Sequence, residues 1–197
     1  MEITLNQNGS GTIEVEYTVS RSLDSLGKLD GNERWNTIPV GKADFTRTID
    51  RIPEMKLLSF SSKENERDLT VTAKLEFENL KALTAFLDAG GRRSSLSGDA
   101  RSGSLVLTLA EGKNLSQDNG DINELYRLIA DISEPYLIKI SMSFPNEGRL
   151  QITNALGLPL PELPGSEIKS AGKKVSFALP LFAVFSSTEG INAEFHW

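Results

Sequence analysis

Stretches in which apolar and polar residues alternate make up much of this chain, and most of them occur in pairs separated by a short polar segment. The first pair covers residues 3–19 and turns at Asn8-Gly9. A period of two on both sides of an Asn-Gly turn is typical of a β-hairpin. On the same grounds we expect three more hairpins, at 55–77, 94–109 and 137–153, and single strands at 174–178 and 191–197.

Between these hairpins the apolar residues are spaced three or four positions apart, which predicts helices. Phe45, Ile49 and Ile52 share one helical face, and Pro53 ends that pattern. Each of the other candidates begins at a residue that can cap a helix and ends at glycine or proline. These helices are expected at 20–31, 79–91 and 121–135.

Hairpins separated by helices, without the strand–helix–strand repeats of a parallel sheet, indicate the α+β class. We expect antiparallel hairpins that form one curved sheet, or two small sheets, packed on the inserted helices. No linker divides the chain, so we expect a single α+β domain over residues 1–197. If the domain has two parts, the boundary between them is expected in the segment 112–120.

Charge and composition exclude several functional classes. The 197 residues contain 21 Lys and Arg against 27 Asp and Glu, a net charge of −6, and no cysteine. The lack of cysteine excludes disulfides, thiolate zinc sites, iron–sulfur clusters and cysteine nucleophiles. The acidic balance argues against a nucleic-acid partner, because phosphate contacts need clustered Lys and Arg. With His196 as the single histidine, we expect no metal site and no cofactor.

Short motifs that look like catalytic or binding signatures occur here at their background rate. The segment 9–11 precedes a strand pattern, whereas the glycine loop of a dinucleotide site opens a helix. A calcium loop centred on Gly120 would place residues without carboxylates at its end positions. The Ser-x-x-Lys pattern of penicillin-interacting hydrolases lacks its partner motifs and occurs at Ser25–Lys28, Ser166–Lys169 and Ser170–Lys173. We therefore expect no catalytic residues.

Two apolar segments have no regular pattern. The segment 155–165 holds four leucines among three prolines, so it forms neither a regular helix nor a central strand. A second apolar stretch covers 179–185. Such segments either cap the open end of the core, or form the lip of an apolar pocket, or touch a membrane surface. The contacts that we expect for an acyl chain in such a pocket are Leu156, Leu158, Leu160, Leu163, Leu181, Phe182 and Phe185.

Arginines are the candidate partners for a charged head group at the rim of that pocket. Arg92, Arg93 and Arg101 form the densest cationic group of the sequence, within a stretch rich in Ser and Gly. Guanidinium groups suit phosphate and carboxylate, although arginines in such loops are more often solvated surface charges. The head-group role is an expectation that requires these residues to lie close to 156–163.

The two ends of the chain resemble a known family. The first hairpin, residues 3–19 with its Asn-Gly turn, together with 172–182 and 191–197, is similar to the extracytoplasmic domain of LppM-type bacterial lipoproteins. That resemblance implies an α+β domain of the cell envelope, associated with lipid or glycolipid binding and anchored by an acylated cysteine before the first hairpin. This chain has no such cysteine and no membrane tail. Because it begins and ends inside strand patterns, we expect that anchoring segments have been removed, and that membrane contact would come only through them.

The function that we expect from the sequence is non-catalytic. The leading hypothesis is an extracytoplasmic, membrane-anchored lipoprotein domain that binds a lipid or another amphiphile in an apolar pocket. The first alternative is a structural or protein-interaction module with a filled core, whose 155–185 region docks an envelope protein. It predicts exposed leucines in one patch and no cavity. The second alternative is a hydrolase of unrecognised type.

Overall fold

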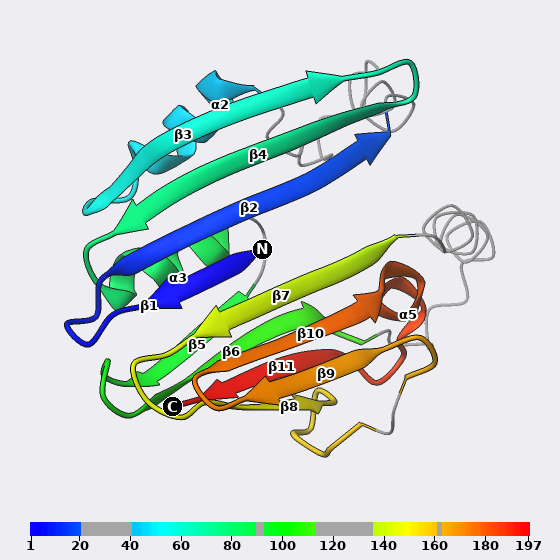
Figure 1. The fold of residues 1–197 in the computed structure, drawn as a ribbon. Coiled ribbons are helices and arrows are strands. Elements are labelled where there is room, and N and C mark those ends of the chain that lie inside the picture. The colour runs from blue at the N-terminus through cyan, green and yellow to red at the C-terminus, as the bar shows by residue number, and fades with distance from the viewer. Residues whose placement is uncertain (21–40, 90–92, 113–135, 161–162) are drawn as a thin grey trace.

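The computed structural model describes residues 1–20, 41–89, 93–112, 136–160 and 163–197 (Figure 1). This part of the chain contains eleven strands in two sheets and three helices, which confirms the α+β class. Of the two expected arrangements, the one with two sheets is present, and the sheets have seven and four strands. One cluster of buried apolar side chains draws on both sheets and on the helices. The single domain and the boundary near 112–120 stay predictions, because 113–120 lie outside the described residues.

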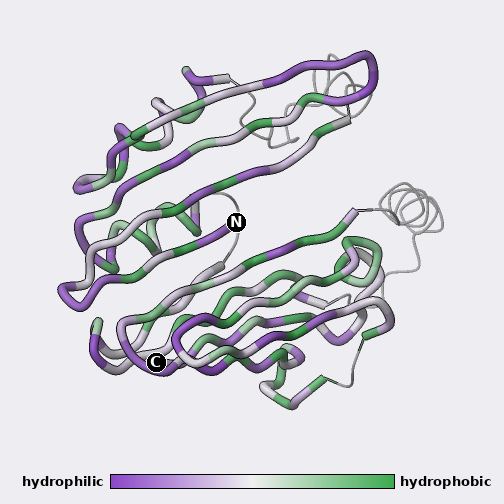
Figure 2. The backbone as a smooth tube through the Cα atoms, viewed as in Figure 1, coloured by the Kyte–Doolittle hydropathy of each residue, from purple (hydrophilic) through white to green (hydrophobic). Residues whose placement is uncertain are grey.

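The larger sheet begins with two long hairpins at the positions that the alternation predicts. At the turn of the first hairpin Gly9 has a φ of 86°, and the Asn8 Oδ1 accepts the Ser10 amide at 3.1 Å. Alternate residues of each strand point to opposite faces, so hydrophobic and hydrophilic positions alternate along these strands in Figure 2. The strands are β1 (Glu2–Leu5), β2 (Gly11–Ser20), β3 (Met55–Glu64) and β4 (Asp68–Phe77).

A parallel pair joins these hairpins to a second, antiparallel half of the same sheet. β1 runs parallel to β7, with Glu2 opposite Ser141 and Thr4 opposite Ser143. The full strand order is β3-β4-β2-β1-β7-β10-β9. Among the described residues, the short strand β1 is therefore the connection between the two halves of the sheet. The strands of the second half are β7 (Leu137–Ser143), β9 (Glu167–Ala171) and β10 (Lys174–Pro180).

The smaller sheet is antiparallel and covers the inner face of this second half (Figure 1). Phe177 of the larger sheet packs on Phe195 of the smaller one, with ring centres 6.2 Å apart. The outer face of the larger sheet carries no helix from the described part of the chain (Figure 1). In spatial order the strands of the smaller sheet are β5 (Arg93–Gly98), β6 (Gly103–Ala110), β11 (Ile191–His196) and β8 (Arg149–Thr153).

The hairpin expected at 137–153 is wrong, because its two strands lie in different sheets. β7 pairs with β1 and β10, whereas β8 pairs with β11. Phe144, directly after β7, is buried and stacks on Trp197. The Gly148 amide donates to the Gly172 carbonyl oxygen at 2.9 Å. The turn signal between the strands therefore marks a crossing from one sheet to the other.

Two of the expected helices are present in the described residues, and a third helix was not predicted. Phe45 and Ile49 are the buried residues of α2, and Phe45 contacts Phe60 with ring centres 5.5 Å apart. Asn79 caps α3, because its Oδ1 accepts the Ala82 amide at 2.9 Å. The helices expected at 20–31 and 121–135 lie outside the described residues, apart from Ser20. The edge strand β9 and the helix α5 were not predicted. The helices are α2 (Lys42–Ile49), α3 (Leu80–Ala89) and α5 (Leu181–Ser186).

Candidate functional site

The segment 154–160, called the leucine loop below, follows β8 at one end of the molecule (Figure 1). Asn154 is buried, and its Oδ1 accepts the amides of Leu156 and Leu158 at 2.9 and 3.0 Å. The Leu160 amide donates to a carbonyl oxygen of β8 at 3.0 Å, which folds the loop back along that strand. These hydrogen bonds hold the backbone, while the side chains of Leu156 and Leu158 are 83% and 58% exposed.

The helix α5 lies at the same end of the molecule, and Figure 2 shows it as largely hydrophobic. The Leu181 amide donates to the Tyr136 carbonyl oxygen at 2.8 Å, just before β7 begins. Val184 is buried and Leu181 is half-buried, but Phe182 is 42% exposed. Leu137, the first residue of β7, is 47% exposed. The exposed side chains of Leu137, Leu156, Leu158 and Phe182 are together called the apolar end.

Backbone contacts connect the leucine loop with the segment that follows α5. The Ala155 amide donates to the Glu189 carbonyl oxygen at 2.9 Å. A Cβ on Gly190 would lie 2.9 Å from the Ala155 Cβ and 3.2 Å from the Glu111 carbonyl carbon, so these segments are closely packed. Glu111 and Glu189 are exposed. Glu189 therefore borders the leucine loop.

The other predicted acyl-chain contacts are placed differently. Leu160 and Leu163 are half-buried and pack against the core, and the side chain of Phe185 lies outside the described part of the structure. Leu137 was missed, because alternation only assigns it to a strand, and its pairing opposite Pro180 brings it beside α5. Two open depressions on the described surface have volumes of about 500 Å³ each, and none of the predicted apolar contacts lines either of them. An acyl-chain pocket at these leucines stays a prediction.

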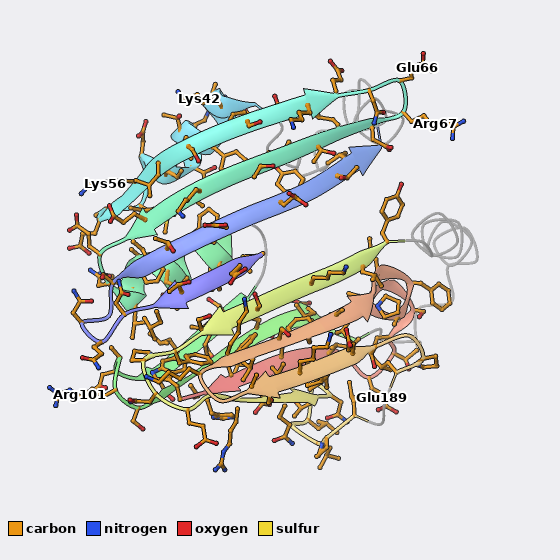
Figure 3. The ribbon with its side chains drawn as sticks, in the orientation of Figure 1. Lys42, Lys56, Glu66, Arg67, Arg101 and Glu189 are labelled. Atoms are coloured by element: carbon orange, nitrogen blue, oxygen red, sulfur yellow. The ribbon has the colours of Figure 1, made fainter. Side chains whose placement is uncertain are left out.

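The structure separates Arg93 from Arg101, two of the three predicted arginines. Arg93 begins β5, and Arg101 lies in the turn beyond its other end, so the strand separates their backbones by roughly 17 Å. Arg101 is also at the end of the smaller sheet opposite to the leucine loop. Figure 3 shows this separation, since its labels for Arg101 and Glu189 stand at opposite ends of the sheet. Arg92 lies outside the described residues, and only the backbone of Arg93 is described. This arrangement does not place Arg101 at the rim of the leucine segment.

The first depression lies beside Arg101. The β1–β2 turn, the start of α3 and the β5–β6 turn form its walls, and Lys81 is also there. The Asp99 carboxylate accepts the amides of Arg101 and Ser102 at 2.7 and 3.2 Å. These hydrogen bonds hold the pKa of Asp99 below its usual value. The depression is open, and Asp99 lines it together with Lys81 and Arg101, so a carboxylate shares it with the two cationic side chains.

The second depression lies on the outer face of the larger sheet, where β1 begins. The Met1 α-ammonium donates to the Lys139 carbonyl oxygen at 2.8 Å, and the Ser141 amide donates to the Met1 carbonyl oxygen at 3.0 Å. The walls include residues 14–16 of β2 and 139–141 of β7. Residues of β1, β4, β9 and β10 line it as well, so the depression is open and spans much of the outer face of the sheet.

The described residues offer contact surfaces and no candidate metal site. They contain no group of three or more His, Asp and Glu side chains that could hold a metal ion. His196 is exposed, with its Nε2 3.8 Å from a carboxylate oxygen of Glu194. The hydrogen bond from Lys56 to Glu78 raises the pKa of Lys56, and burial raises that of Tyr17. None of the helices described here has the length and apolar composition needed to cross a bilayer.

Comparison of the chain with protein-family models, with curated proteins and with solved structures finds no match. The geometry of the described residues therefore carries the functional argument by itself. Its two most specific features are a hydrogen-bonded loop with exposed leucines and an open depression on the outer face of the larger sheet.

Proposed function

We propose that the protein is a non-catalytic interaction module that docks a protein partner through the apolar end. The observation that carries this proposal is the exposure of Leu156 and Leu158 on a loop that Asn154 holds in place. Large apolar side chains on an ordered surface gain burial on docking. They also lose little conformational freedom, because the loop is already fixed before binding. These two properties suit the leucines to act as anchors in a pocket of the partner.

The charges around the apolar end favour a protein over an anionic lipid surface. Glu189 is exposed, and its carbonyl oxygen accepts the amide of Ala155 in the leucine loop. A carboxylate there would be repelled by anionic head groups and would complement Lys or Arg at the rim of a protein pocket. The partner that fits is a protein whose apolar pocket has a cationic border. A lipid or another amphiphile is the competing ligand, and the experiment below separates the two.

A photo-crosslinking residue at position 156 tests the proposal in cells, with position 58 as the matched control. Leu58 is 51% exposed in the irregularity of β3, away from the apolar end. We expect position 156 to crosslink to one protein that position 58 does not reach. With that partner purified, Leu156→Ser combined with Leu158→Ser should weaken binding at least about 30-fold, since anchors dominate such interfaces. Leu58→Ser should leave the dissociation constant unchanged.

Two results would reject this function. The first is equal affinity of the parent and of the Leu156→Ser, Leu158→Ser variant for the crosslinked partner. The second is co-sedimentation with vesicles of phosphatidylcholine, alone or with phosphatidylglycerol, that is lost in the same variant while no protein crosslinks at 156. That outcome would establish docking on a lipid surface instead.

We also propose that the domain works in the cell envelope, as an extracytoplasmic part of a membrane-anchored lipoprotein. The support for this location is the resemblance of the two ends of the chain to LppM-type lipoproteins. Fractionation of cells that produce the natural full-length protein tests the location. Recovery in the cytoplasmic fraction would reject it.

A further inference from the structure

The strand β9 forms an exposed edge of the larger sheet. It is the last strand in the spatial order, and among the described strands it pairs only with β10 (Figure 1). All of its residues, Glu167–Ala171, are exposed. An exposed edge strand presents backbone amides and carbonyl oxygens to which another strand can bind. The exposure of β9 therefore leaves this edge accessible to a further strand.

The hydrogen bonds of β10 fix which backbone groups of β9 point away from the sheet. The Phe144 amide donates to the Lys173 carbonyl oxygen at 2.8 Å, so the odd-numbered residues of β10 face β7 and its even-numbered residues face β9. Those even-numbered residues lie opposite the odd-numbered residues of β9. Ile168 and Ser170 therefore direct their amides and carbonyl oxygens away from β10.

The side chains of β9 divide between the two faces of the sheet. Ile168 lies opposite the buried Phe177 and so belongs to the inner face, yet it is 48% exposed. Glu167 and Lys169 belong to the outer face, where the Lys169 Nζ lies 2.7 Å from a carboxylate oxygen of Glu167. The edge thus carries one large apolar side chain between two opposite charges.

A second copy of β9 matches this edge when the two strands run antiparallel about a twofold axis at Ile168. Each Ile168 then forms a hydrogen-bonded pair with Ile168 of the other copy, because its backbone groups face outward. On the outer face, Glu167 of each copy lies directly opposite Lys169 of the other. Opposite charges in such positions stabilise a strand pair. The same register therefore joins complementary charges on one face and two isoleucines on the other.

The neighbouring registers lack this match. A twofold axis at Lys169 places the two lysines directly opposite each other, and an axis at Glu167 does the same with the two glutamates. Like charges in these positions destabilise a strand pair. An axis at Ser170 places Ile168 opposite Gly172, where the chain already turns with a φ of 57°. The charge pattern of β9 thus favours the register centred on Ile168.

We propose that two copies of this chain associate through β9, in the register that pairs Ile168 with itself. The two larger sheets then continue into each other across this edge. The contact is short, because the Ser166 amide already donates to the Leu163 carbonyl oxygen at 2.9 Å. Since a short contact buries little surface, the dimer is weak and reversible. This association is separate from the docking proposed above, which uses the side chains of the leucine loop.

Charge reversal on β9 tests the association together with its register. Glu167→Lys and Lys169→Glu each turn two attractive pairs of the dimer into repulsive ones, so each should weaken the dimer at least about tenfold. The double variant, Glu167→Lys with Lys169→Glu, restores opposite charges and should associate within about threefold of the parent. Lys56→Glu is the matched control, because it breaks an exposed ion pair on β3, at the other edge of the same sheet.

Sedimentation equilibrium measures the dissociation constants, at concentrations up to about 1 mM because the contact is small. Lys56→Glu should associate like the parent. An equimolar mixture of Glu167→Lys and Lys169→Glu should form a mixed dimer at concentrations where neither variant dimerises alone. A parent that stays at its monomer mass of 21.6 kDa would overturn the proposal. A double variant as weak as the single variants would overturn it as well.

Single cysteines test the register by a second route, since the chain contains no cysteine of its own. In Ile168→Cys the two thiols face each other across the axis, so a bismaleimide with a two-carbon spacer should link the copies. Ser170→Cys is the matched control on the same edge and face, but its two positions lie four residues apart along the strand pair, roughly 14 Å. Equal crosslinking in both variants, or none in Ile168→Cys, would overturn the proposal.

Discussion

The Trp197 indole Nε1–H donates a hydrogen bond of 2.9 Å to the Asp99 carbonyl oxygen, so the last residue of the chain closes against the β5–β6 turn. The indole ring also stacks on Phe144, with ring centres 5.2 Å apart and planes 16° apart. A Cβ on Gly103 would lie 2.8 Å from this ring, so glycine at that position permits the contact. Trp197 thereby joins the smaller sheet to the segment that crosses over from the larger one.

We expect Trp197→Ala to lower the free energy of unfolding by about 3 kcal/mol, because it removes a buried aromatic side chain. Trp197→Phe keeps a ring against Phe144 and loses the hydrogen bond, so it should cost about 1 kcal/mol. Urea unfolding at neutral pH measures both changes. Phe182→Ala is the control, since an exposed aromatic side chain should change stability by less than about 0.5 kcal/mol. Equal losses in Trp197→Ala and Phe182→Ala would contradict the assigned role of Trp197.

Asn154→Ala should release the leucine loop. The substitution removes the oxygen that accepts the amides of Leu156 and Leu158, and its cost should be about 2 kcal/mol because the site is buried. Hydrogen exchange at these two amides should accelerate. Asn146→Ala is the matched control, since the exposed Asn146 makes a single hydrogen bond to the Arg101 carbonyl oxygen. Unchanged exchange at Leu156 and Leu158 would show that other contacts hold the loop.

Leu158 and Leu160 should respond differently to serine, although they are two positions apart. Leu160 packs against the core, so Leu160→Ser should lower the free energy of unfolding by about 1–2 kcal/mol. Leu158 is largely exposed, so Leu158→Ser should stay within about 0.5 kcal/mol of the parent. Thermal or urea unfolding of the two variants makes the comparison. A large loss in Leu158→Ser would place that side chain in the core.

Local sequence patterns predicted the elements better than they predicted the strand partners. The hairpins β1–β2, β3–β4 and β5–β6 each pair strands that are adjacent in the chain, and turn residues such as Asn8 and Gly9 mark the first of them. The pairing of Glu2 with Ser141 joins segments far apart in the sequence, and alternation carries no information about such a partner. The same limit explains the wrong hairpin at 137–153.

The candidate site was predicted in part. Leucines among prolines indicated an unusual surface at 155–165, but their spacing could not show that Leu156 is exposed while Leu160 is packed against the core. That difference arises where the loop folds back on β8. The arginines show that residues close in the sequence can lie far apart in the fold. Arg93 and Arg101 are close in the sequence, yet an intervening strand holds their backbones apart.

The last prediction concerns Tyr17, whose pKa is raised mainly by burial and also by the nearby negative charge of Asp44. The neutral phenol is therefore favoured in the folded state. Its contribution to stability is fully present below pH 10, the ordinary pKa of tyrosine, and is lost as the pH rises above that value. Between pH 9.5 and 11.5 the free energy of unfolding should fall more steeply for the parent than for Tyr17→Phe. Because the side chain is only partly buried, the difference in slope should be smaller than the ~1.4 kcal/mol per pH unit that one whole proton gives. Between pH 6 and 8 the free energy of unfolding of each protein should stay constant, since the single histidine, His196, is exposed. Urea unfolding across both pH windows measures this, and parallel curves for the two proteins above pH 10 would contradict the assignment to Tyr17.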